Sequence, residues 1–115
     1  MRAQRFEEAL RIFDEAIEIN PGCFYAWQNR GFVLQQIGRL PEALECFSKT
    51  IELNPRSTGP WQNQGEVLFC LEKYKEAIEC FDKAIELAPE NEYALSVRQE
   101  ALSKINTKSS ILRSI

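Results

Sequence analysis

Cysteine and carboxylate side chains are the groups in this sequence that could bind a metal ion or take part in catalysis. The chain has 115 residues, with 4 cysteines, 17 Asp and Glu residues and no histidine. Without histidine, a zinc site would need all the thiolates, yet Cys23, Cys46, Cys70 and Cys80 form no C-x-x-C pair. Catalysis by a histidine-activated serine or cysteine is excluded as well. We therefore expect no metal site, and we interpret the cysteines as reduced thiols of a cytoplasmic protein.

The carboxylates follow a pattern that is typical of solvated helix faces. Acidic residues recur on the polar side of predicted helices, with partners one turn away, as Glu79 has in Lys83. No Ser, Thr or Cys has a base beside it in the sequence. Gly-rich phosphate-binding motifs are also absent. The sequence therefore predicts no catalytic residue and no cofactor, and we expect that the protein is not an enzyme.

Charge and hydropathy narrow the class of partner. The 14 Lys and Arg residues against 17 acidic ones give a net charge of −3, whereas nucleic-acid binding requires a basic surface. No apolar run approaches the roughly 18 residues that span a bilayer. We expect neither nucleic acid nor a membrane as partner, which leaves a protein or a peptide.

An internal repeat is the most informative pattern in the sequence. Residues 24–57 and 58–91 are identical at 16 of 34 positions without a gap. Residues 1–23 match only the second half of this period. The shared residues include a tryptophan, a glycine, an alanine, a phenylalanine and a proline in each copy: Trp27, Gly31, Ala43, Phe47 and Pro55, then Trp61, Gly65, Ala77, Phe81 and Pro89.

Each period reads as two helices joined by a turn. Ala43, Phe47 and Ile51 recur at the spacing of four that places residues on one helix face. Pro55 ends the period, because proline is not tolerated inside a helix. Gly38 fits the turn between the two helices. The pattern predicts an all-α protein.

These residues resemble the tetratricopeptide repeat, whose pattern is W-x2-L-G-x2-Y, then A-x3-F, then P, with a period of 34. Arg30 and Gln64 replace the apolar residue before the glycine, and leucine replaces the tyrosine. The resemblance implies a right-handed solenoid of antiparallel helix-turn-helix units over residues 1–105. This domain would contain a half repeat with only the second helix at 1–23, repeats at 24–57 and 58–91, and a capping helix at 92–105. A flexible tail at 106–115 would follow.

The resemblance also implies a binding site, since related domains bind extended peptides on the concave wall formed by their first helices. Asn29 and Asn63 lie one repeat apart and would hold a peptide backbone, because an amide both donates and accepts hydrogen bonds. Alternatively, both amides are merely solvated or bind local groups. Tyr93 and Glu100 continue the wall onto the capping helix. The predicted peptide-binding residues are Tyr25, Gln28, Asn29, Phe32, Gln36, Gln62, Asn63, Glu66, Cys70 and Val97.

Charge within this groove limits its ligand. Glu66 and Glu100 are its only charged residues, so it lacks the cationic clamp with which one subclass of these domains binds a C-terminal carboxylate. We predict a non-catalytic protein-interaction module that binds an extended peptide or a partner protein. Two alternatives stay open: a self-associating structural fragment of a longer array, or the regulatory arm of a larger enzyme.

The N-terminal half repeat suggests self-association. Its helix lacks the first helix of its own hairpin, so Phe6, Leu10 and Phe13 are expected to keep apolar surface uncovered. Because an exposed apolar patch usually marks an interface, we predict a homodimer or higher oligomer through this helix.

Overall fold

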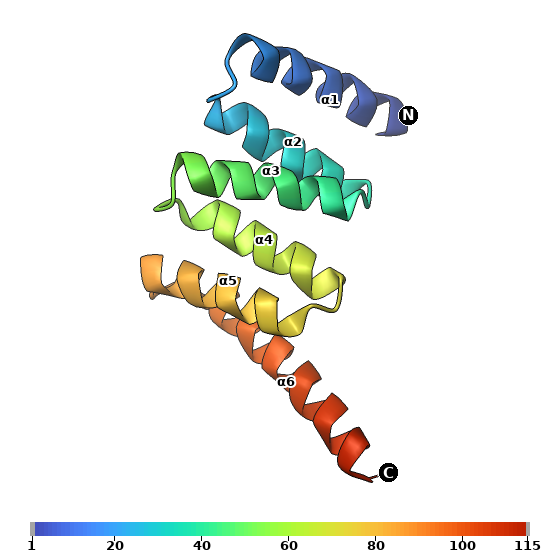
Figure 1. Ribbon diagram of the computed structural model, residues 1–115, viewed down its shortest axis with the longest axis vertical. Helices are drawn as coiled ribbons and strands as arrows, with labels where there is room; N and C mark the ends of the chain where they lie inside the picture. The colour runs from blue at the N-terminus through green and yellow to red at the C-terminus, as the bar shows by residue number, and fades with distance from the viewer. Residues whose placement is uncertain (1, 115) are drawn as a thin grey trace.

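Six helices stacked side by side make up the part of the chain that the structure describes (Figure 1). The structure is a computed structural model, which describes the backbone of residues 2–114 and the side chains of residues 5–107. The helices are α1 (Arg2–Ile19), α2 (Phe24–Gln36), α3 (Leu40–Leu53), α4 (Thr58–Cys70), α5 (Tyr74–Leu87) and α6 (Glu92–Ser114). Each packs against the next along the chain, in an elongated molecule of 54 × 32 × 19 Å. The predicted all-α stack of hairpins is confirmed.

Proline sets the boundaries between repeats. Helices α1, α3 and α5 end at or just before Asn20-Pro21, Asn54-Pro55 and Ala88-Pro89. After the first two of these prolines the tryptophan of the next helix fixes the connection: the Trp27 indole N–H donates to the Pro21 carbonyl at 2.8 Å, and Trp61 donates to Pro55 at 2.9 Å.

The turns inside the two complete hairpins need a left-handed residue at the same place. Gly38 has a φ of 81°, and Glu72, at the equivalent position of the next repeat, has a φ of 61°. Glycine adopts this conformation without steric cost, whereas glutamate does not. The second hairpin therefore forms its turn at a cost that the first avoids.

The core of each hairpin forms where a glycine meets a phenylalanine. Phe47 and Phe81 are fully buried. A Cβ atom on Gly31 would lie 2.7 Å from Phe47 Cε1, and one on Gly65 would lie 2.5 Å from Phe81 Cε1. Because both distances are far below van der Waals contact, only glycine allows the helices to approach this closely.

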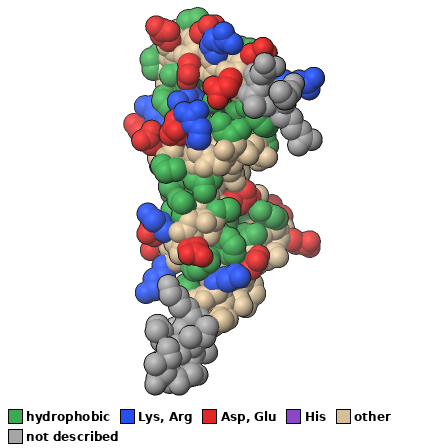
Figure 2. All heavy atoms as spheres, turned by 90° about the vertical axis from the view of Figure 1, so that its right-hand side faces the viewer, with side chains coloured by type: hydrophobic (Ala, Val, Ile, Leu, Met, Phe, Trp, Pro, Cys, Tyr) green, Lys and Arg blue, Asp and Glu red, His purple; other side chains and the backbone are tan. Residues whose placement is uncertain are grey.

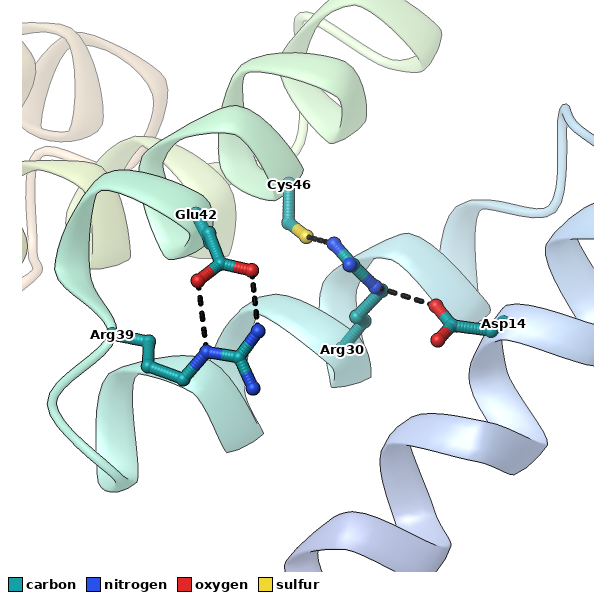
Figure 3. Close-up of polar contacts among 5 residues, drawn as sticks. All are labelled: Asp14, Arg30, Arg39, Glu42 and Cys46. Atoms are coloured by element: carbon teal, nitrogen blue, oxygen red, sulfur yellow. Dashed lines mark hydrogen bonds and ion pairs between the residues drawn. The ribbon is translucent and has the colours of Figure 1, made fainter.

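Polar contacts join successive repeats at the positions where the family pattern has an apolar residue (Figure 3). Arg30 on α2 donates to Asp14 on α1 at 2.7 Å and to the Cys46 sulfur on α3 at 3.0 Å. Burial raises the pKa of the Cys46 thiol above its usual value, although the guanidinium opposes this shift. The same figure shows Arg39 paired with Glu42 at the start of α3.

The second repeat keeps this arrangement with neutral groups. Gln64 lies between Ser48, at 3.2 Å, and the Cys80 sulfur, at 3.8 Å. Burial raises the pKa of Cys80 to about 11. The departure of Arg30 and Gln64 from the family pattern therefore has a structural reason, since each bridges the helices on either side.

Two expectations differ from the structure. Helix α6 continues to Ser114 rather than ending at residue 105, because residues 92–114 contain neither proline nor glycine. The expectation that Leu10 stays uncovered is wrong: it is 6% exposed and packs with Val33 and Leu34 of α2. Phe6 and Phe13 also pack against this cluster.

The uncovered apolar surface of α1 lies on another face, at Ile12 and Ile19, which are 62% and 86% exposed. Ile12 stands one repeat period before Cys46, which is fully buried under α2.

Candidate functional site

Helices α2, α4 and α6 are the first helices of successive units and lie next to one another, since α4 contacts both of the others. Their shared face holds a cavity of about 240 Å³. It is bounded chiefly by α4 and α6, with one residue each from α2 and α5. The lining residues are Gln35, Glu66, Phe69, Cys70, Phe81, Tyr93, Val97 and Glu100.

Three of the ten predicted site residues line this cavity, namely Glu66, Cys70 and Val97. Phe81 was not predicted as a site residue, because its place in the repeat marks it as a core residue. The repeat pattern does not show that Phe81 also borders the cavity. The cavity thus opens directly onto the hydrophobic core of the second hairpin, in which Phe81 packs with Leu68.

The residues predicted on α2 form a separate, more exposed surface. Tyr25 is 76% exposed and Phe32 is 52% exposed. Tyr25 packs edge-on against Phe24, with 5.6 Å between ring centroids. Gln36 and Asn29 are also exposed, whereas Asn63 on α4 is half-buried.

Two predicted glutamines lie between helices. The Gln62 side-chain oxygen accepts a hydrogen bond from the Asn91 amide at 2.8 Å, and Asn91 in turn accepts one from the Ala94 backbone N–H at the start of α6. Gln62 therefore supports the position of α6. Gln28 lies next to Gly59 of α4, and its Oε1 atom is buried with no hydrogen-bond partner among the described residues.

The two charged side chains that line the cavity, Glu66 and Glu100, are both negative. The Gln35 amide donates to Glu66 Oε2 at 3.2 Å, which links α2 to α4. Burial raises the pKa of Tyr93 to about 12, and the neighbouring carboxylates of Glu66 and Glu100 add to this shift. The Tyr93 phenol, like any tyrosine at neutral pH, is protonated and can donate a hydrogen bond.

The carboxylates of Glu66 and Glu100 take no part in the ion pairs of the described region. The ion pairs found among residues 5–107 involve other acidic side chains, those of Asp14, Glu42, Glu52, Asp82 and Glu86. Glu66 is half-buried and Glu100 is exposed. A ligand in the cavity would therefore meet two carboxylates that form no ion pair with a Lys or Arg of the described region.

Metal binding and membrane insertion have no candidate site in the described residues. These residues contain no group of three or more His, Cys, Asp or Glu side chains that could hold a metal ion. None of the helices described is both long enough and apolar enough to cross a bilayer.

On the side of the molecule in Figure 2, hydrophobic side chains gather over the middle, with charged side chains above and below them.

Comparison with known proteins identifies the family. A tetratricopeptide repeat model matches residues 1–58, and a second one matches residues 60–91. The chain belongs to the tetratricopeptide repeat family. Its repeats are of a kind that generally serves protein interaction rather than catalysis. No curated protein is significantly similar to the chain in sequence.

Solved structures of other tetratricopeptide domains share the fold. The first such domain of Spaghetti (RPAP3), described as bound to the HSP90 peptide SRMEEVD, has a TM-score of 0.86 at 19% identity, over 91% of this chain and 83% of that one. The first such domain of human RPAP3 has the same TM-score and identity over 95% and 86%. The domain of Arabidopsis OM64 has a TM-score of 0.80 at 21% identity, over 87% and 83%.

Proposed function

We propose that this protein is a non-catalytic interaction module that binds an extended peptide, or an extended segment of a partner protein, on the shared face of α2, α4 and α6. The observation that carries the proposal is the cavity between α4 and α6, together with the exposed Tyr25 and Phe32 on the neighbouring helix α2. Exposed aromatic side chains beside a pocket are typical of protein-binding surfaces.

The two asparagines give this surface a way to hold a peptide backbone. Asn29 is exposed and Asn63 is half-buried, one repeat apart on neighbouring helices. Each amide can donate to a carbonyl and accept from an N–H, which suits a peptide group of any sequence. Side chains of the peptide would then be recognised by the cavity and by the aromatic surface.

The ligand of a structural neighbour does not carry over. The peptide in the Spaghetti complex, SRMEEVD, has acidic residues at three of its last four positions. The groove of this chain carries Glu66 and Glu100, which would repel such an end. We also propose that the partners include neither nucleic acid nor membrane, in line with the net charge of −3, and that the protein is cytoplasmic, in line with its four free thiols.

A displayed library of random peptides, selected on the whole chain, tests the proposal. The double variant Asn29→Ala/Asn63→Ala should keep its helicity and melting temperature. It should bind selected peptides roughly tenfold more weakly, because each neutral hydrogen bond contributes ~1 kcal/mol. Asn106→Ala, an exposed asparagine farther along α6, serves as the control and should bind normally. Unchanged affinity of the double variant would contradict the role given to these amides.

Self-association through α1 is a second candidate function, and the exposure of Ile12 and Ile19 favours it. Head-to-tail pairing with α6 of another copy is sterically unfavourable. In such a pair, α6 would take the place of the first helix of a hairpin and α1 would take the place of the second helix. Gln99 would then stand at the position of Gly65, where glycine leaves room for the phenylalanine, which would here be Phe13. We propose instead that α1 pairs with α1 of a second copy. Light scattering over a concentration series should then show a dimer that Ile12→Glu dissociates. A monomer at all concentrations would contradict the pairing.

A further inference from the structure

The cavity between α4 and α6 combines apolar walls with a negatively charged opening. Phe69, Phe81 and Val97 supply its apolar side. Glu66 and Glu100 supply two carboxylates. At about 240 Å³ it is smaller than the roughly 300–1,000 Å³ of small-molecule sites, so its size suits one long side chain.

The groups around the carboxylates do not satisfy them. Glu66 accepts a hydrogen bond from the Gln35 amide and also interacts with the Tyr93 phenol, but a carboxylate can accept several more hydrogen bonds and neither partner is charged. The ion pairs described above use other acidic residues. Tyr93 and Gln35, the polar neighbours in the cavity, are uncharged, so the two carboxylates keep their negative charge. The geometry and the charge therefore favour a cationic group.

A cation alone would not use the apolar walls. Lysine and arginine carry their charge at the end of an apolar stem, and they bury the stem while the charged end meets polar groups or solvent. Their cationic ends also interact favourably with aromatic rings, and Phe69 and Tyr93 both line this cavity.

We propose that this cavity accepts a lysine or arginine side chain of a peptide bound along α2, α4 and α6. The inference rests on the proposed function and adds the chemical class of the ligand. An acidic side chain would meet Glu66 and Glu100 at close range, and a purely apolar one would leave both carboxylates facing an uncharged group.

Peptides selected by display on the whole chain provide the probe. Each selected peptide is remade with every basic residue in turn replaced by a neutral analogue of similar length, norleucine for lysine or citrulline for arginine. One basic position should prove critical, and its replacement should weaken binding about fivefold or more, the effect expected of a half-buried ion pair.

Matched variants of the protein locate the contact. Glu66→Gln and Glu100→Gln each remove one charge without changing size, and each should weaken binding by a similar factor. Glu8→Gln removes one charge from an exposed site on α1 and should leave affinity unchanged. The neutral-analogue peptide should no longer distinguish Glu66→Gln and Glu100→Gln from the parent, because the charge pair is already absent. Melting temperatures of all three variants confirm that they are folded.

The outcomes separate this inference from the function on which it rests. Peptides that need Asn29 and Asn63 but tolerate loss of every basic residue, or bind Glu66→Gln and Glu100→Gln as well as the parent, would overturn the inference alone. If no selected peptide depends on residues of α2, α4 or α6, both the proposed function and the inference fail.

Discussion

The two complete repeats, α2–α3 and α4–α5, bury the same residues in the same way. Gly31 lies under Phe47 and Gly65 lies under Phe81. The repeats differ at the turn and at the bridging residues described above, and they also differ on the groove face of their first helices. Where α2 presents Tyr25 and Phe32 to solvent, α4 has Gly59 and Glu66 at the equivalent positions.

This comparison separates residues that make the fold from residues that can recognise a partner. The shared tryptophan, glycine, alanine, phenylalanine and proline are those that a hairpin needs for packing and for ending its helices, whereas the shared Asn29 and Asn63 would hold a peptide backbone in both repeats. The positions that diverge give α2 an exposed aromatic surface and give α4 a wall of an acidic cavity. A ligand crossing both helices would therefore meet two chemically different environments.

The largest expected effect concerns the shared core. Phe47→Ala and Phe81→Ala should each lower the free energy of unfolding by ~3–5 kcal/mol, since both rings are fully buried. Urea denaturation followed by circular dichroism measures the two losses. The account requires them to be similar, so a loss confined to one repeat would break the equivalence of the two cores.

Glycine substitutions sharpen the same comparison with smaller losses. Gly31→Ala and Gly65→Ala should each destabilise the protein by ~1–3 kcal/mol, because the added methyl group meets a buried ring. Gly59→Ala is the matched control, since its Cβ would come no closer than 3.8 Å to Gln28 Nε2. Thermal melts should rank Gly59→Ala as neutral or stabilising. Equal losses at all three positions would contradict the close approach of the helices.

The smallest effect is expected at the hairpin turns. Glu72→Gly should raise the free energy of unfolding by about 1 kcal/mol, because it relieves a left-handed glutamate, whereas Gly38→Ala should lower it by a similar amount. Chemical denaturation of both variants gives opposite signs under this account. Two changes of the same sign would mean that the turns are not equivalent.

The repeat period made most of the fold predictable. It marked where the second helix of each repeat ends, because proline recurs in register, and it marked Gly31 as the point where two helices approach closely. It did not show that the ring of Phe47, in the same hairpin, is what fills the space beside that glycine. It did not mark the end of α6, since no helix-breaking residue stands there. The pattern also misjudged Leu10, because a helix pattern shows which residues are apolar but not which neighbouring helix covers them.

The candidate site could be predicted from the sequence less completely than the fold. Periodicity assigns residues to a face, and three of the residues assigned in this way, Glu66, Cys70 and Val97, line the cavity. Periodicity does not show how deeply a side chain is buried between helices. It therefore could not show that Phe81 borders the cavity or that Gln62 accepts a hydrogen bond from Asn91 at the start of α6. Those contacts depend on how far the helices are apart.

A nuclear magnetic resonance titration of the whole chain with a display-selected peptide tests the central claim most directly. The account predicts that backbone amide signals of α2, α4 and α6 shift on binding, most strongly around Phe32, Glu66 and Val97, while those of α1 and of the exposed faces of α3 and α5 stay in place. A set of shifts centred on α1 or on α3 and α5, with α4 and α6 unmoved, would contradict it.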